Sequence, residues 1–304
     1  MHRDKDPEEV SRIVYQMQRP NRSLRFLQKL GFTNNRNIVW SWYEPRNFGD
    51  WIGPYLYLAI TGQKPLHYPG HNTKSRRARA LVTVGSILRH MKTDDVFSVW
   101  GSGIISRSDE FARPNSVYAV RGPHSRKRMI DMGYPSSEVF GDPAILMPLV
   151  MPKDKADAPY EVGVIPHYAT IADIRRRYAN IDGVHIIDVT KRIDEVIYEI
   201  TLCKVILSSS LHGLILANAY GVPNNWIASD AKLQGDDIKF LDYLESCGVR
   251  PPTQPISLAT LPDFNSLKTA GESGIIANHS ELLEPLWDAC PFIPKSTRMP
   301  SRLQ

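Results

Sequence analysis

Residues 204–223 read Lys-Val-Ile-Leu-Ser-Ser-Ser-Leu-His-Gly-Leu-Ile-Leu-Ala-Asn-Ala-Tyr-Gly-Val-Pro, and this stretch decides the fold. The apolar run 205–207 is typical of a parallel strand that is buried on both faces. Three serines follow that can cap a helix, and apolar residues then recur at helical spacing from Leu211 to Ala219. Gly221 and Pro223 end that helix. We therefore predict a strand, a tight polar turn and a helix.

His212 stands at the start of the predicted helix, above the carboxyl end of the strand. Ligands of open α/β sheets bind at that edge. Free N–H groups at a helix N-terminus, with the positive end of the helix dipole, favour a phosphate or carboxylate there. An imidazole beside an anion site is typical of a catalytic centre. On this turn alone, a capping histidine without chemistry is an equally good interpretation.

Further strand–turn–helix units lie on both sides of Pro148–Pro159, a segment rich in Pro, Lys and Asp that we expect to link two domains. Such units indicate parallel sheets with helical crossovers, and so an α/β protein of two Rossmann-like domains that meet over a cleft. The predicted parts are a helical N-terminal appendage (1–36), an N-terminal domain (37–150), a C-terminal domain with the His212 turn (160–290) and a flexible tail (291–304). The predicted strands cover 37–42, 80–84, 96–100, 117–120, 162–165, 184–188, 205–207 and 225–228.

The composition is that of an ordinary globular protein, with 42% apolar and 23% charged residues. The sequence lacks a long apolar run for a spanning helix, and its charged N-terminus lacks the apolar core of a signal peptide. We therefore expect a cytoplasmic protein, at the inner face of the membrane if it docks on one. Three scattered cysteines favour reduced thiols over a zinc module, and no ligand cluster predicts a metal site.

The formal net charge is +5, and basic side chains gather at 74–79, 126–128 and 175–177. We interpret most of these clusters as solvated faces. The alternative is attraction to anionic substrates or to anionic lipid headgroups, with peripheral contact between the protein and a membrane surface. Nucleic acid is not an expected partner, because no recognition motif with interleaved aromatic residues accompanies the charge.

Turns of the first half also fall at the carboxyl ends of predicted strands. Glycine there permits close approach of a ligand to the backbone, while serine and asparagine supply donors. For each turn alone, ordinary turn chemistry is the better interpretation, and 101–103 lacks the third glycine of a dinucleotide fingerprint. The cleft and donor candidates in these turns are Asn47, Asp50, Gly85, Ser86, Gly101, Ser102 and Asp142.

Arg121 ends a predicted strand just before Gly-Pro, where its planar fork can bind a carboxylate or phosphate. An ion pair with Asp142 is the structural alternative. His167 occupies the matching place in the second half. A ligand role and a structural role are equally good interpretations of this histidine.

Taken together, six short motifs of this sequence resemble those of the polysaccharide pyruvyltransferase family. No single motif is specific, but six in the family's order over about two hundred residues are hard to obtain by chance. A further string, Asp237-Ile-Lys-Phe-Leu-Asp242, lies near the end of the resemblance. The six motifs are Asn47-Phe-Gly-Asp50, Trp100-Gly-Ser-Gly103, Val120-Arg-Gly-Pro123, Gly141-Asp-Pro143, Val164-Ile-Pro-His167 and Ser209-Ser-Leu-His-Gly213.

The resemblance implies a GT-B-like pair of Rossmann-type domains around a central cleft. It also implies phosphoenolpyruvate as donor substrate, with no cofactor, and transfer of pyruvate as a ketal onto two hydroxyls of one sugar. The implied acceptor is a polysaccharide or lipid-linked oligosaccharide in exopolysaccharide biosynthesis.

By position, the resemblance implies that Arg121 binds the donor and that His212 is the general acid. In some members an arginine stands where this chain has Ser210, which leaves less positive charge at the site. The resemblance also implies that the residues just before His212 (Ser209, Ser210 and Leu211) help to hold the donor. The other predicted donor contacts are Gly213, Gly101, Ser102 and His167, the last three from their places at strand ends.

The implied chemistry is consistent with the residues themselves. Phosphoenolpyruvate is at least doubly negative, and its methylene carbon must gain a proton before a hydroxyl adds. The helix dipole lowers the pKa of His212, whereas a bound dianion raises it. The dianion should have the larger effect, because it carries full charges. Two alternatives remain: a GT-B-type sugar-nucleotide glycosyltransferase, and a non-enzymatic glycan-binding or assembly protein of the same fold.

Overall fold

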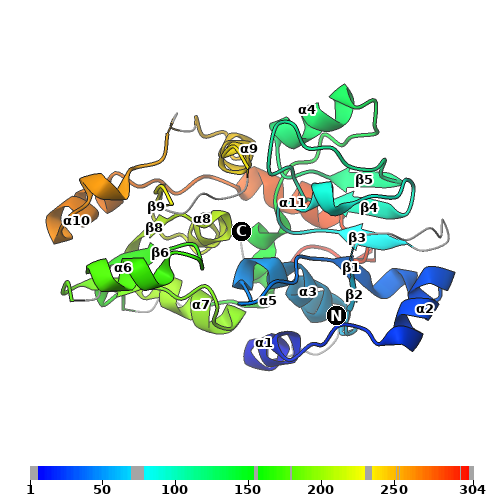
Figure 1. Cartoon of the computed structure of the whole chain (residues 1–304), viewed down its shortest axis with the longest axis horizontal. Coiled ribbons are helices and arrows are strands. Elements are labelled where there is room, and N and C mark those ends of the chain that lie inside the picture. The colour runs from blue at the N-terminus through cyan, green and yellow to red at the C-terminus, as the bar shows by residue number, and fades with distance from the viewer. Residues whose placement is uncertain are drawn as a thin grey trace.

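The computed structural model describes residues 6–69, 79–153, 157–178, 180–229, 235–250, 252, 254–294 and 296–300. It contains two separate parallel sheets, each covered by helices (Figure 1). The first sheet consists of β1 (Asn37–Val39), β2 (Leu66–Tyr68), β3 (Ala80–Val82), β4 (Phe97–Trp100) and β5 (Ser116–Ala119). The second consists of β6 (Tyr160–Ile165), β7 (Val184–Ile186), β8 (Cys203–Ser208) and β9 (Asn224–Trp226). The prediction of a GT-B-like α/β fold with two parallel sheets is confirmed.

The strand orders are β2-β1-β3-β4-β5 and β7-β6-β8-β9. In both sheets the chain adds a strand on one side of the first strand and then continues on the other side. The order therefore reverses between β1 and β3, and again between β6 and β8. Ligands of doubly wound sheets bind outside the carboxyl ends of the strands at these switch points. Gly85 follows β3 and Ser209 follows β8, so both predicted turns lie where the topology favours a ligand.

Eleven α-helices and four short 3-10 helices connect and cover the described strands. The α-helices are α1 (Pro7–Tyr15), α2 (Arg22–Leu30), α3 (Phe48–Thr61), α4 (Pro123–Asp131), α5 (Met147–Val150), α6 (Ile171–Tyr178), α7 (Ile193–Thr201), α8 (Leu211–Ala219), α9 (Ile238–Ser246), α10 (Phe264–Glu272) and α11 (Ser280–Asp288). The 3-10 helices are η1 (Asn34–Arg36), η2 (Leu88–His90), η3 (Pro143–Leu146) and η4 (Leu258–Thr260).

Helix α1, which lies in the predicted N-terminal appendage, contacts both domains. It packs against α3 of the first domain and α7 of the second. Its Ser11 Oγ donates a hydrogen bond of 2.5 Å to Asp194 Oδ1. The apolar spacing of the N-terminal segment thus predicted the helix, but the two surfaces that it joins were not readable from the spacing.

The C-terminal segment returns to the first domain, which changes the predicted boundary at residue 290. Helix α9 packs against α4 (Figure 1), and α11 packs against η3. Trp100 Nε1 donates a hydrogen bond of 2.9 Å to the Leu286 carbonyl. Phe292, in the segment expected to be a flexible tail, packs edge-on against Trp100. The expected linker at 148–159 also starts late, because α5 extends to Val150 and is largely buried.

Candidate active site

The turn between β8 and α8 is held by its own serines. Ser208 Oγ accepts from the Ser210 N–H at 3.0 Å and donates to the Ser210 carbonyl at 2.9 Å. Ser209 Oγ accepts from the His167 N–H at 2.9 Å, which ties the turn after β6 to the turn after β8. A Cβ at Gly213 would collide with Ser208 Oγ. These contacts fix the first turn of α8 and therefore the position of His212.

The first turn of α8 carries no side-chain cap, because Ser210 forms no capping hydrogen bond although it occupies the N-cap. The leading N–H groups of a helix lack intrahelical acceptors, and the helix dipole makes this end positive. The predicted anion site at Ser210, Leu211 and Gly213 therefore has the expected backbone geometry.

His212 projects from the second domain onto the first. Its ring lies so close to the backbone that a Cβ at Gly49 would collide with Nδ1, and one at Gly85 would lie 3.5 Å from Cε1. Nε2 is 3.9 Å from Asp142 Oδ2. Nε2 is buried and has no hydrogen-bond partner among the described residues. Buried ring nitrogens are normally satisfied, so an unpaired one at a switch point is typical of a group that meets a ligand.

The imidazole of His212 is neutral in the free protein. Burial lowers its pKa to about 3, and the positive charges of Arg121 and Lys239 act in the same direction. The sequence predicted this direction from the helix dipole, whereas burial is the larger cause in the structure. A proton on His212 therefore requires a source of negative charge close to the ring.

Asp142 lies behind the site rather than on its surface. Its carboxylate is fully buried and accepts from the Gly85 N–H at 3.2 Å and from the Ala144 N–H at 3.0 Å. Burial raises its pKa to about 6. Asp142 therefore fixes the Gly85 turn on which the His212 ring rests, and its role as a cleft residue stays a prediction.

Arg121 does not present a free fork in this structure. The side chain is fully buried, and all three guanidinium nitrogens are engaged. Nε pairs with Asp242 Oδ2 at 3.0 Å, while the two terminal nitrogens donate to Ser86 Oγ at 2.5 Å and to the Ile104 carbonyl at 2.6 Å. The ion-pair partner is Asp242 from α9, not Asp142. Direct contact between Arg121 and a donor remains a prediction that this geometry does not favour.

Asp242 joins α9 to the start of α4. Its carboxylate accepts from the backbone N–H groups of His124 and Ser125, at 2.8 and 2.9 Å, and from Ser125 Oγ at 2.6 Å. Gly122 is required here, because a Cβ would collide with the Asp242 carbonyl oxygen. The strings Val120–Pro123 and Asp237–Asp242 therefore meet in space and hold the C-terminal segment on the first domain.

Gly101 and Ser102 also support the site from behind. Ser102 is fully buried and its Oγ donates to the Gly85 carbonyl at 2.8 Å. Gly101 has φ +84° and leaves no room for a side chain beside Pro143. Their donor-binding role stays a prediction, and in this structure both residues shape the Gly85 turn.

Lys239 is the charged residue that the sequence interpretation missed. It lies in the first turn of α9, and its charge acts on Asp50, His167 and His212, which places it beside residues of both domains. Burial lowers its own pKa to about 8. No ion pair of Lys239 occurs in the described part of the chain. The sequence signal that could have identified Lys239 was its place inside the motif Asp237–Asp242, but a lysine near the start of a predicted helix is also typical of a solvent-exposed side chain.

Asp50 and His167 complete this group. Burial raises the pKa of Asp50 to about 7, with Lys239 opposing, and lowers the pKa of His167 to about 4. Asn47 caps α3 through the Gly49 N–H at 3.2 Å and so sets the backbone against which His212 packs. The two half-buried groups Asp50 and Lys239 thus titrate near neutral pH, as acid–base groups of active sites do.

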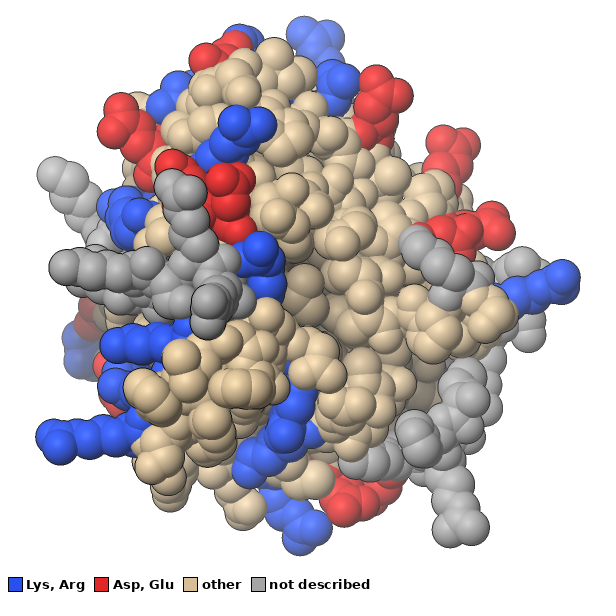
Figure 2. All heavy atoms as spheres, turned by 90° about the vertical axis from the view of Figure 1, so that its right-hand side faces the viewer, with Lys and Arg blue, Asp and Glu red and all other residues tan. Residues whose placement is uncertain are grey.

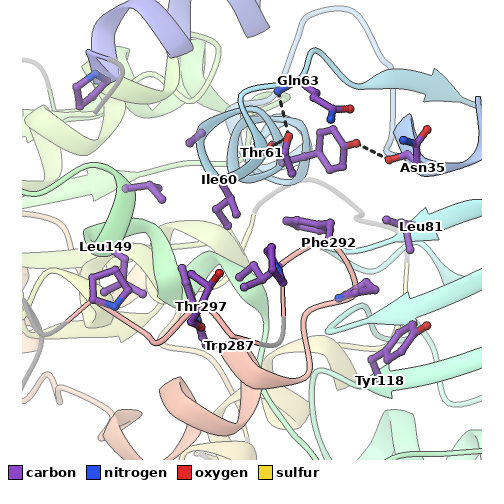
Figure 3. Close-up of a pocket in the computed structure, with 18 of the residues that line it drawn as sticks. Asn35, Ile60, Thr61, Gln63, Leu81, Tyr118, Leu149, Trp287, Phe292 and Thr297 are labelled. Carbon is purple, nitrogen blue, oxygen red and sulfur yellow. Dashed lines mark hydrogen bonds between the residues drawn. The ribbon is translucent and has the colours of Figure 1, made fainter. Parts of the chain in front are cut away.

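A cavity of about 780 Å³ lies away from these residues, between α3, the first sheet and the C-terminal segment (Figure 3). Its walls are mostly apolar, and polar groups there bind one another. For example, Thr61 Oγ1 donates to the Tyr57 carbonyl at 2.6 Å, and Trp287 Nε1 to the Thr297 carbonyl at 3.2 Å. None of the predicted site residues lines it. We therefore place the candidate site at the switch points.

The described residues contain no group of three or more His, Cys, Asp or Glu side chains placed to hold a metal ion. None of the helices in the described ranges has the length and apolar character needed to cross a membrane.

Comparison with known proteins gives a family match over part of the chain. Residues 97–231 match the sequence profile of the family described as polysaccharide pyruvyl transferase. The chain is 34% identical over 175 residues to the uncharacterized protein L143 of Acanthamoeba polyphaga mimivirus, covering 55% of this chain and 59% of that protein. It is 27% identical over 144 residues to the succinoglycan biosynthesis protein ExoV of Rhizobium meliloti (strain 1021), covering 46% and 44%.

These matches span about half the length of both relatives. No solved structure matches the chain. The matched segment includes the turn between β5 and α4 that contains Arg121, the turn that contains Asp142, and the whole β8–α8 unit. The segment that carries His212 therefore matches the polysaccharide pyruvyl transferase profile, the family that the order of the motifs resembles.

Proposed function

We propose that this protein transfers the pyruvyl group of phosphoenolpyruvate to a sugar of a polysaccharide or lipid-linked oligosaccharide, where it forms a ketal. One observation carries the proposal: the buried, unpaired Nε2 of His212 lies where an uncapped helix N-terminus meets the other domain. The family match and the relative named for succinoglycan biosynthesis support a role in exopolysaccharide or other cell-surface glycan synthesis. Phosphoenolpyruvate is a cytoplasmic metabolite, so the reaction would occur in that compartment.

Charge decides whether His212 can act as an acid. Lowering its pKa from 6.5 to about 3 corresponds to roughly 5 kcal/mol against the imidazolium. A single negative charge about 4 Å from the ring stabilises the imidazolium by roughly 4 kcal/mol at an effective dielectric constant near 20. A donor with at least two negative charges therefore outweighs the burial. Protonation of His212 would then accompany donor binding and be absent in the free enzyme.

The positive charge for the donor would come from α8 and Lys239. The uncapped N–H groups of α8 suit one anionic group of phosphoenolpyruvate. Lys239 supplies a full charge to the same place, which compensates for Ser210 at a position where some family members have arginine. Arg121 contributes at a distance, because its own nitrogens are already engaged.

The proposed reaction consists of an addition and a displacement, and its protons balance. The His212 imidazolium gives a proton to the donor methylene, a sugar hydroxyl adds at the neighbouring carbon, and Asp50 takes the hydroxyl proton. A second hydroxyl of the sugar then displaces phosphate. The departing phosphate takes the proton from Asp50, and His212 regains one from the second hydroxyl. Asp50 suits this exchange because its pKa is raised to about 7.

Phosphoenolpyruvate should stabilise the purified protein against heat, because a ligand that binds only the folded state adds about 2.7 kcal/mol at a hundred times its Kd. Thermal melting with phosphoenolpyruvate and with nucleotide sugars, together with a phosphate-release assay, tests this. Stabilisation by nucleotide sugars with release of nucleotide would instead indicate a glycosyltransferase. Stabilisation by glycans alone, without turnover, would indicate a binding protein.

Lys239→Met should weaken phosphoenolpyruvate binding by roughly tenfold to a hundredfold, because a hydrogen bond to a charged group contributes about 1.5–3 kcal/mol. The acceptor KM should change little. Calorimetric donor titration and steady-state kinetics separate the two constants. Lys127→Met is the matched control, since Lys127 is exposed and pairs with Asp131 on its own helix. Unchanged donor affinity in Lys239→Met would remove Lys239 from the donor site.

A further inference from the structure

The apolar side chains of helix α2 face the solvent. Phe26 is 61% exposed, and Phe32, just beyond the helix, is 74% exposed. Leu27 and Leu30 are also exposed. The fully buried side chain of α2 is Gln28, a polar residue. This inverts the usual arrangement, and clustered exposed apolar side chains mark interaction surfaces.

The contacts of α2 hold this orientation. Gln28 Nε2 donates to Asn37 Oδ1 and to the His67 carbonyl, both at 3.1 Å, which fixes the helix on β1 and β2. Asn21 caps the first turn, and its Oδ1 accepts from the Leu24 N–H at 3.0 Å. Gly31 ends the helix with φ +87°. The outward apolar face is therefore a fixed part of the fold.

The same segment carries strong positive charge. Residues 16–43 contain five Lys or Arg and no Asp or Glu, a formal charge of +5 that equals the net charge of the whole chain. No ion pair of these five appears among the described residues. Three of the guanidinium groups bind carbonyl oxygens and so keep their charge. The five are Arg19, Arg22, Arg25, Lys29 and Arg36.

The basic clusters identified in the sequence differ from this segment, because several of their side chains form ion pairs. Within 126–128, Arg126 pairs with Glu138 and Lys127 pairs with Asp131. Within 175–177, Arg175 and Arg176 also pair with aspartates. The cluster at 74–79 lies outside the described residues apart from Arg79. Each described cluster keeps a single arginine without an ion pair, Arg128 and Arg177, which bind carbonyl oxygens. The larger group of uncompensated positive charges therefore lies beside α2.

We propose that α2 and Phe32 form a docking surface for a membrane that contains anionic lipids. Apolar side chains inserted at the acyl boundary, with arginine and lysine at the phosphates, are the pattern of helices that lie in a membrane interface. Charge complementarity selects this occupant, because a second copy of the chain would bring five positive charges against five. Figure 2 looks onto this side of the molecule, where blue side chains border tan surface in its lower half. This docking function is independent of the proposed chemistry.

Vesicle co-sedimentation tests the surface. The full chain should bind phosphatidylcholine vesicles that contain phosphatidylglycerol, should bind pure phosphatidylcholine weakly, and should be released by salt, which screens exposed charges. Each basic residue near such a membrane contributes about fivefold to affinity. Arg22→Glu with Lys29→Glu should therefore lower binding by at least about tenfold. Phe26→Ser with Phe32→Ser should lower it comparably.

The control pair is Lys127→Glu with Arg176→Glu, which reverses the same number of charges in the ion-paired clusters. It should leave vesicle binding nearly unchanged, and circular dichroism should show native folding for all three variants. Equal losses in control and test pairs would overturn the proposal, as would binding that ignores phosphatidylglycerol. A change of oligomeric state in the phenylalanine variants without vesicle binding by the wild type would assign the surface to self-association instead.

Discussion

Replacing His212 with glutamine should lower turnover by roughly a hundredfold or more, while phosphoenolpyruvate affinity stays within a few-fold of wild type. Glutamine is similar in size and keeps a hydrogen-bond donor in place of the ring. It cannot release a proton to the donor methylene. Donor affinity by calorimetry and kcat by phosphate release give the two quantities separately. His185→Gln is the control, since His185 pairs with Glu199 in the second domain and outside the site.

The pH profile gives an independent check of the same role. In the free protein the pKa of His212 is lowered to about 3, so the imidazolium is absent at neutral pH. The bound dianion would raise this pKa, and kcat would fall as the pH rises through the raised value, because the acid loses its proton. That alkaline limb should disappear in His212→Gln. A variant that keeps wild-type turnover but loses donor affinity would show that His212 is only a ligand contact.

Local patterns were sufficient for most of the fold. The apolar run 205–207 and the helical spacing after it predicted β8 and α8, and both lie where expected. The strand β2 was missed because its sequence, Leu-His-Tyr, contains no continuous apolar run, and the helix α10 because its sequence is weakly apolar. The return of α9 and α11 to the first domain could not be predicted, because it rests on contacts across more than a hundred residues.

The sequence predicted where the candidate site lies, but not which partners its charged side chains have. The pattern of strands and turns placed His212, Gly85 and Ser209 at the carboxyl ends of strands, where the structure has them, and their functional roles stay predictions. Whether a charged side chain meets a ligand or a partner depends on tertiary pairing, which a single sequence does not show. Arg121 was expected to face the donor and instead pairs with Asp242. Lys239 was not considered as a site residue, although it forms no ion pair among the described residues and the charges of Asp237 and Asp50 act on it.

Arg121→Ala should lower the free energy of unfolding by about 3–5 kcal/mol, because it leaves the Asp242 carboxylate buried without its partner. Urea denaturation measures the loss. Arg126→Ala is the control, because Arg126 pairs with a largely exposed Glu138 and such pairs contribute about 0–1 kcal/mol. Replacing Arg121 and Asp242 together with apolar side chains of similar volume should recover much of the lost stability.

The same variant separates the two roles open to Arg121. If Arg121 positions α9, then Arg121→Ala moves Lys239 with that helix, and donor affinity and stability fall together. Arg121→Lys should also destabilise the protein, because lysine lacks the fork that reaches Asp242, Ser86 and Ile104 at once. If Arg121 binds the donor directly, Arg121→Lys would raise the donor KM while unfolding stays within the range of the Arg126 control. The engaged guanidinium makes the first result the expected one.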